Sequence, residues 1–271
     1  MQMNFDPLNV EQVKDIKKKV IEKQIEYFKQ QDIIGGKIFN ILEKESKVLY
    51  YPLEDQEVWG FSEKIGDRFF FGINTAISYD KQVFAAAHEL YHIWFVFSGS
   101  EIMSDKIYEN ITNSEVEQKA NRFAAEFLVN DELLCKEMDI YQINKETISV
   151  KEIVMLATLF TVPYKTMVKR LYEINVYSAD KFNLFMQYTN QDVTIWRDRL
   201  GLSLPVREKK IGLSDLVDKA ISLYEKNLIT YEKLNYLLEM ADLTPEKMGI
   251  KTKPTYVPPS EEELDGIMED D

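Results

Sequence analysis

The sequence predicts an α+β fold, in which a small antiparallel sheet lies beside one buried helix and a mostly helical C-terminal half follows. Three observations indicate this architecture. Aromatic and β-branched residues, which strands favour, dominate residues 47–74. Residues 81–97 are apolar on nearly every side, as expected for a helix enclosed by other elements. From about Lys145 to Lys247 the apolar residues recur at helical spacing.

Capping and turn residues place the elements before the helical half. A first helix is expected from Asn9 to Gln31, with Asn9 as its cap and Gln12 at the capping-box position. The turn-like stretches "EDQ" and "KIGD" separate the strands that follow. The next elements are three strands and two helices: "KVLYYPL", "EVWGFSE", "DRFFFGIN", "KQVFAAAHELYHIWFVF" and "SEVEQKANRFAAEFLV".

The composition argues against several classes of protein. The chain of 271 residues has a net charge of −13, which disfavours binding to nucleic acid through the overall field. No apolar run is long enough to span a membrane, and the N-terminus lacks the basic and apolar regions of a secretion signal. Cys135 is the single cysteine, so no internal disulfide can form. We therefore expect a cytoplasmic protein that does not act in a membrane.

The chain is expected to divide into three parts. Residues 1–178 are predicted to form the main domain, which includes a helix-turn-helix-like segment at about 148–175. Residues 179–257 are predicted to form a helical C-terminal region. Residues 258–271 hold seven acidic residues and no basic one. This tail is expected to be disordered, because it offers little apolar surface to offset its chain entropy.

The two histidines of the chain occur together, in "AAAHELYHIWF". His88 and His92 are four residues apart, so on a helix both imidazoles lie on one face and can bind one divalent ion. Glu89 projects about 100° around the axis, where it can take a proton from metal-bound water. This is the HExxH pattern of metallopeptidases. Without a metal, burying these three side chains would require several compensating hydrogen bonds, so we favour a metal site.

A catalytic site of this kind usually has a third protein ligand and an open position for water. No other histidine exists, so a carboxylate must serve, and Glu117 is favoured over Glu115, which points to a different face. Asn121 lies one turn after Glu117 and could orient one of the histidines. A structural role stays open for Glu117, because it has capping-box spacing from Ser114. A cap at Thr112 would instead use Glu115.

Two other functions compete with peptidase activity. The segment "IVMLATLFTVPYKTMVKRL" has the spacing of a helix-turn-helix, with Lys165, Lys169 and Arg170 expected to be exposed, which would suit a DNA-binding regulator. The favoured interpretation is a helical pair that supports the peptidase core. The second alternative is a partner-binding regulatory protein in which the metal site is structural and not catalytic.

Three stretches together resemble the ImmA/IrrE family of metallopeptidases: "FGIN", "AAAHELYH" and "EQKANRFAAEFLVNDELL". The family signature is an HExxH helix followed by E-x-x-A-N-x-F-A-A and an aliphatic run. The resemblance is close from about Phe71 to Leu134, and it implies a zincin-like metallopeptidase core. Asn130 departs from the pattern, since many members have proline after the aliphatic run.

The resemblance also implies roles for individual residues. Glu117 and the two histidines of the motif would bind one divalent ion, with Zn²⁺ as first choice and Mn²⁺ or Fe²⁺ also fitting the ligand set. Glu89 would be the catalytic base. The motif leaves the oxyanion stabiliser unidentified, and Tyr91 and Arg122 are candidates for it.

The implied substrate is a protein. Members of the family cleave helix-turn-helix transcriptional repressors, often encoded in mobile elements or stress-response loci, and the resemblance implies such a repressor here. The strand "DRFFFGIN" is a candidate for holding the substrate by edge pairing. Direct binding to nucleic acid is not expected.

Overall fold

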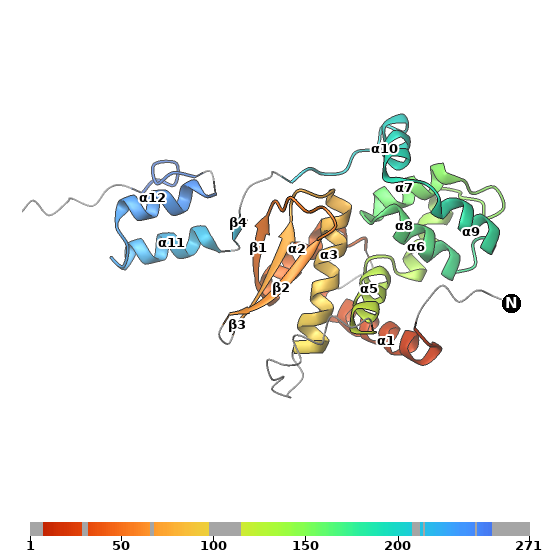
Figure 1. Ribbon diagram of the computed structural model, residues 1–271, viewed down its shortest axis with the longest axis horizontal. Coiled ribbons are helices and arrows are strands. Elements are labelled where there is room, and N and C mark those ends of the chain that lie inside the picture. The colour runs from red at the N-terminus through yellow and green to blue at the C-terminus, as the bar shows by residue number, and fades with distance from the viewer. Residues whose placement is uncertain are drawn as a thin grey trace, which may run out of the picture. The chain divides into compact units, whose positions relative to one another are not determined.

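The computed structural model describes residues 8–28, 32–65, 68–97, 115–207, 212–213, 215–241 and 243–250. The chain forms two compact units, the first ending at Ser214 and the second beginning at Asp215 (Figure 1). The domain boundaries expected at residues 178 and 257 remain predictions. The acidic tail lies outside the described residues.

The sheet of the first unit is mixed. Its strands are β1 (Lys47–Tyr51), β2 (Gly60–Ile65), β3 (Arg68–Asn74) and β4 (Gly212–Leu213). The spatial order is β2-β3-β1-β4, with β1 parallel to β3 and the other two pairings antiparallel. The predicted α+β class is confirmed. The expectation of a purely antiparallel sheet is wrong for the β1–β3 pair.

The parallel pair arises because the connection after β1 crosses the sheet instead of forming a hairpin. Residues 52–59 carry the chain past β3 to the outer edge, where β2 begins. The Asn74 side chain holds this connection. Its Oδ1 accepts from the Leu53 N–H at 3.0 Å, and its Nδ2 donates to the carbonyls of Asp55 and Val58 at 3.0 and 2.7 Å. Hydrogen bonds from the side chain of Asn74, at the end of β3, therefore fix the course of this connection and with it the order of the strands.

One face of the sheet packs on helices. The side chains on this face are fully buried: they are Val48 of β1 and, two residues apart on β3, Phe71 and Ile73. Helix α2 (Ile38–Glu45) contacts β1, and α3 (Tyr79–Tyr91) contacts β2 and β3. Helix α3 is buried along most of its length and continues as a π-helical turn, His92–Phe97.

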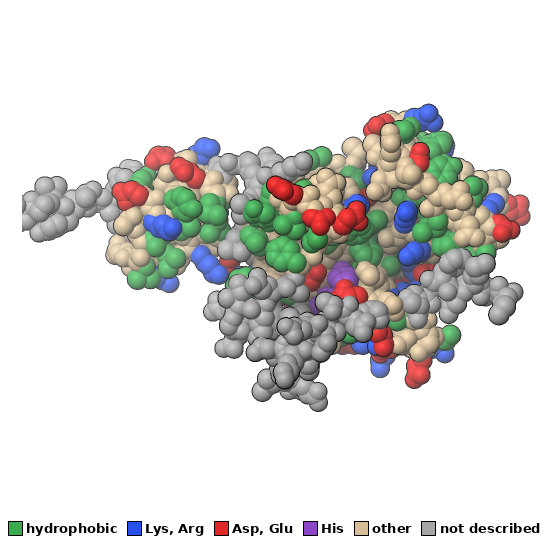
Figure 2. Space-filling model, in the orientation of Figure 1, with side chains coloured by type: hydrophobic (Ala, Val, Ile, Leu, Met, Phe, Trp, Pro, Cys, Tyr) green, Lys and Arg blue, Asp and Glu red, His purple; other side chains and the backbone are tan. Residues whose placement is uncertain are grey.

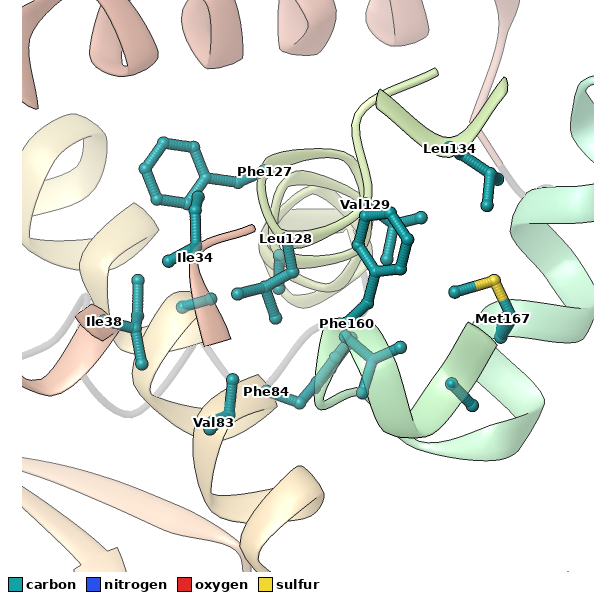
Figure 3. Packing of buried hydrophobic residues seen from close by; sticks show 14 of the residues in the cluster. Ile34, Ile38, Val83, Phe84, Phe127, Leu128, Val129, Leu134, Phe160 and Met167 are labelled. Carbon is teal, nitrogen blue, oxygen red and sulfur yellow. The ribbon is translucent and has the colours of Figure 1, made fainter. Parts of the chain in front are cut away.

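The core of the first unit continues from α3 through α5 (Glu115–Leu128) to the later helices. Figure 3 shows Val83 of α3, Phe127 of α5 and Phe160 packed in one apolar region. Among the described residues of this unit, the other helical segments are the 3₁₀ turn Gly35–Lys37, α1 (Val10–Tyr27), α6 (Asp131–Ile140), α7 (Val150–Phe160), α8 (Tyr164–Glu173), α9 (Ala179–Met186) and α10 (Asn190–Arg199).

Helix α1 begins as predicted. Asn9 Oδ1 accepts from the Gln12 N–H at 3.0 Å, and Gln12 Oε1 accepts from the Asn9 N–H at 2.9 Å, which completes the capping box. The helix ends at Tyr27 because Phe28 is extended, whereas the expected end, Gln31, lies outside the described residues. Helix α1 packs on α5.

The helix-turn-helix-like segment corresponds to α7 and α8. Lys165 and Lys169 are exposed as expected. The expectation that Arg170 is exposed is wrong: its side chain is 0% exposed, and its guanidinium pairs with three carboxylates. A surface helix would leave this charge in water, but here acidic groups of three helices surround it. This burial favours the supporting role of the helix pair over a recognition helix.

The second unit is a small helical pair. It contains α11 (Leu216–Glu225) and α12 (Tyr231–Glu239), which pack around a small core of Ala220, Tyr224 and Leu234 together with Leu238. In the part of the chain that the structure describes, no helix is long and apolar enough to cross a membrane.

Candidate metal centre

The two histidines of α3 converge on one point. The Nε2 atoms of His88 and His92 are 3.1 Å apart, and the ring centroids are 4.9 Å apart. His92 begins the π-helical turn, a feature often found at functional sites. The two side chains are 15% and 5% exposed. Histidine atoms are still visible on the surface in Figure 2, with acidic side chains beside them.

A third group comes from α5. Glu117 Oε2 lies 3.0 Å from His88 Nε2, and Glu117 Oε1 lies 3.4 Å from His92 Nε2. Helix α5 can approach α3 closely because Ala120 and Ala124 carry small side chains that are fully buried. Two elements far apart in the sequence thus bring three potential ligands together. We refer to His88, His92 and Glu117 as the metal cluster.

The spacing of these donor atoms fits a bound cation. A tetrahedral ion with bonds of about 2.0–2.1 Å separates its ligand atoms by about 3.3 Å. His88 Nε2 and His92 Nε2 are 3.1 Å apart, and the Glu117 oxygen nearest to each ring is a different one, Oε2 at 3.0 Å from His88 and Oε1 at 3.4 Å from His92. With one donor atom taken from each residue, the three atoms lie within 4.8 Å of one another. Two imidazoles and one carboxylate also leave a fourth tetrahedral position for water or substrate. The donor set therefore fits Zn²⁺, and Mn²⁺ and Fe²⁺ accept the same ligand types.

Hydrogen bonding and burial prepare the imidazoles for this role. His88 Nδ1 lies 3.0 Å from Asn121 Oδ1. Because an amide oxygen only accepts, the neutral ring carries its proton on Nδ1 and offers Nε2 as the donor atom. Burial, reinforced by the charge of His88, lowers the pKa of His92 to about 4. Burial, the largest single effect, acts to lower the pKa of His88, but the hydrogen bond to Glu117 and the charges of Glu89 and Glu117 together outweigh it and raise that pKa.

Glu89 lies beside the cluster in a place that solvent barely reaches. The residue is 6% exposed, and its Oε2 has no hydrogen-bond partner among the described residues. Burial raises the pKa of Glu89 to about 7, against the opposing effect of the His88 charge. A carboxyl group with a pKa near neutrality can both accept and return a proton, as a general base must.

The sequence around this cluster matches a known peptidase domain. Residues 43–172 match the IrrE N-terminal-like domain of the M78 peptidases. The chain carries an M78 peptidase domain. The resemblance to the ImmA/IrrE family and the zincin-like fold class are thereby confirmed, and the domain is of the metallopeptidase type. Comparison with curated proteins and with solved structures gives no significant match.

Of the two acidic residues at the start of α5, Glu117 is the one that faces the histidines of the M78 domain. Glu115 instead accepts hydrogen bonds from Gln12 Nε2 and Lys119 Nζ, both at 2.7 Å. The candidate caps of this helix, at residues 112 and 114, lie outside the described residues.

The structure does not bring Arg122 to the metal cluster of the M78 domain. Arg122 follows Glu117 by five residues, which turns it about 140° around the helix. Its guanidinium donates to Glu126 and Glu173, both at 2.5 Å. Tyr91 packs its ring against neighbouring aromatic side chains, and burial raises its pKa to about 12. The oxyanion stabiliser therefore stays unassigned.

Proposed function

We propose that this protein is a metal-dependent endopeptidase that cleaves a helix-turn-helix transcriptional repressor. One observation supports the chemistry above all others. One donor atom from each of His88, His92 and Glu117 lies within 4.8 Å of the other two, and the buried Glu89 lies beside them. Burying a carboxyl group without a hydrogen bond to one oxygen costs free energy, so a purely structural cluster would gain nothing from it.

In the proposed mechanism each residue has a separate task. Glu117 and the two histidines would hold one divalent ion, Zn²⁺ as first choice, which when bound supplies Lewis acidity toward water and the scissile carbonyl. Glu89 accepts the proton of the attacking water and delivers it to the leaving amine. Asn121 keeps His88 in the tautomer that offers Nε2 to the ion.

The substrate is expected to pair with β2, and not with β3. The expectation that "DRFFFGIN" pairs with substrate is wrong, because β3 lies between β2 and β1. Strand β2 is the outer strand on the side of the active-site helix α3. The Asn74 N–H donates to the Trp59 carbonyl at 3.0 Å, so alternation directs the N–H and C=O of Gly60 away from β3. An extended peptide could bond to them there.

The identity of the substrate rests on the resemblance to the ImmA/IrrE family, whose members cleave helix-turn-helix repressors. The acidic net charge of −13 is compatible with a basic DNA-binding protein as partner. The burial of Arg170 makes the α7–α8 pair of this chain a poor DNA reader, so we propose that the repressor, and not this protein, contacts DNA.

The first experiment measures the metal content of freshly purified protein by elemental mass spectrometry. We expect about one equivalent in the wild type and a clear loss in Glu117→Ala, because two imidazoles alone hold an ion less tightly. Glu115→Ala is the matched control: it removes a carboxylate from the same helix, but one that pairs with Gln12 and Lys119. It should retain the metal.

Two outcomes would count against the proposal. A wild-type protein that cannot be loaded with Zn²⁺, Mn²⁺ or Fe²⁺ would contradict the metal site itself. A metal-loaded protein that leaves co-expressed helix-turn-helix repressors intact would favour the alternative, in which the metal is structural and the protein binds a partner without cleaving it.

A further inference from the structure

Gly60 begins β2 at the point where this strand meets helix α3. A Cβ atom at this position would lie 3.2 Å from the Gly72 carbonyl oxygen, 3.3 Å from Glu89 Oε1 and 3.5 Å from Ala85 Cβ. The first two separations are shorter than ordinary van der Waals contact, so a neighbour would have to shift by a few tenths of an ångström. Because Gly60 has no side chain, a small space remains beside the strand, and the Glu89 carboxylate lies at its edge.

The backbone at Gly60 cannot easily move away. Gly60 is opposite Ile73, which is fully buried on the face that packs on α3. The preceding Trp59 is held from two sides. Its carbonyl accepts from Asn74, and its ring meets the Phe84 ring edge-on at 6.0 Å. The strand is therefore fixed on α3 next to Gly60. An added Cβ would press on the Gly72 carbonyl oxygen and on the Glu89 carboxylate, and of these two the carboxylate belongs to a flexible side chain.

The Glu89 carboxylate, by contrast, has little else to fix it. Its Oε2 has no hydrogen-bond partner among the described residues, although the side chain is buried. Where hydrogen bonds do not orient a carboxylate, packing against neighbours sets its rotamer. Gly60 and Ala85 supply small neighbours on the strand and helix sides.

We propose that Gly60 is a positioning residue for Glu89: the absence of a side chain at residue 60 lets the carboxylate lie where it serves as general base. The inference rests on the proposed function, and it adds a residue outside the HExxH helix to the machinery. Gly60 also presents its N–H and C=O at the outer edge of the sheet. The strand that would hold the substrate therefore also sets the place of the base.

The first test compares two glycine substitutions in the same sheet. Gly60→Ala should lower kcat for cleavage of a purified helix-turn-helix repressor by about 10- to 100-fold, since displacements below 1 Å at reacting groups have effects of this order. KM and metal content should stay near the wild-type values. Gly212→Ala is the matched control, because its Cβ would meet only Tyr50 at an ordinary 3.7 Å.

The second test needs no activity. Gly60→Ala should lower the midpoint of thermal unfolding of the metal-free protein by a few degrees. The same substitution in a Glu89→Ala background should lower it less, because the contact with Oε1 no longer exists. Such a double-mutant cycle isolates the coupling between the two residues.

The outcomes separate this inference from the proposed function. A lower kcat together with thermal coupling supports it. Additive thermal shifts, an unchanged kcat, or a rise in KM alone would overturn it, the last because it indicates substrate pairing instead of positioning. If the double-mutant cycle shows thermal coupling but the wild-type protein cleaves no repressor, the contact between Gly60 and Glu89 is confirmed and the proposed function is contradicted.

Discussion

Helix α5 supplies polar side chains to two clusters that differ in whether their charged and polar groups are satisfied by other side chains. Toward α3 it presents Glu117 and Asn121 to the metal cluster. On another face it presents Arg122 and Glu126 to an ion-pair cluster with Arg170. The full ion-pair cluster consists of Arg122, Arg170, Lys17, Glu126, Asp131 and Glu173.

The ion-pair cluster is electrically balanced, whereas the metal cluster is not satisfied by the chain alone. Three basic and three acidic side chains face one another in the first. Arg170 also donates to the Val129 carbonyl at 3.1 Å. In the second, two imidazoles and the Glu117 carboxylate converge on one point, and Glu89 Oε2 has no hydrogen-bond partner among the described residues. The ion-pair cluster holds helices together, whereas the metal cluster is suited to bind an ion and, with Glu89, to activate water.

The largest expected effect is on peptide cleavage, and it tests the role of Glu89 beside the metal cluster. Glu89→Gln should reduce repressor cleavage by about 10²- to 10⁴-fold, the usual contribution of a general base. The amide is close in shape, so metal content should not change. Thermal stability should be retained or raised, because a buried carboxyl group is replaced by a neutral one. Undiminished cleavage, measured by gel electrophoresis of a purified repressor, would contradict the assignment.

The next largest effect should appear in stability instead of activity. Arg170→Met should lower the free energy of unfolding by about 3–5 kcal/mol, because it leaves buried carboxylates without their cation. Urea denaturation measures this loss. Metal content of the folded fraction should match the wild type, since Arg170 belongs to the other cluster.

A second variant keeps this prediction testable if Arg170→Met does not fold. Adding Glu126→Gln removes one of the stranded charges and should recover part of the loss. A stable Arg170→Met protein, or one that loses its metal while folded, would show that the two clusters are not separate in the way described.

How far the sequence predicted each cluster follows from the range of the interactions. His88 and His92 lie one helical turn apart, so local periodicity brings them together, and motif spacing adds Glu117. The burial of Arg170 depends on carboxylates from α5, α6 and α8. Local spacing showed only a basic residue on an amphipathic helix, and the sequence therefore favoured exposure.

The same limit applies to the sheet. Residues 47–74 were predicted as strands from their composition, and three strands are found there. Their order depends on the path of the chain after β1, which Asn74 fixes through hydrogen bonds to a preceding loop. Alternation of apolar residues shows which face is buried, but it does not show which strands are neighbours. Gly60 was missed for this reason, because its closeness to Glu89 follows from that order.

A smaller effect tests how far the metal cluster depends on residues that do not bind the ion. Asn121→Ala should weaken metal affinity by about 10- to 100-fold, as expected when the partner of a ligating histidine is lost. Competition with a chromophoric chelator measures this affinity. Lys119→Ala, which removes the partner of Glu115 on the same helix, should leave it unchanged. Equal affinities in wild type and Asn121→Ala would mean that the hydrogen bond to His88 does not help to orient the ring.

The smallest expected effect comes from the rim of the ion-pair cluster. Lys17 lies 2.8 Å from Asp131, but the two side chains are 43% and 36% exposed. Lys17→Met should therefore change the free energy of unfolding by less than about 1 kcal/mol, because solvent screens exposed pairs. It is matched to Arg170→Met, since both remove a cation that pairs with Asp131. If urea denaturation gave equal losses, burial would not be what separates them, and the contrast between a balanced interior and an open metal site would need another cause.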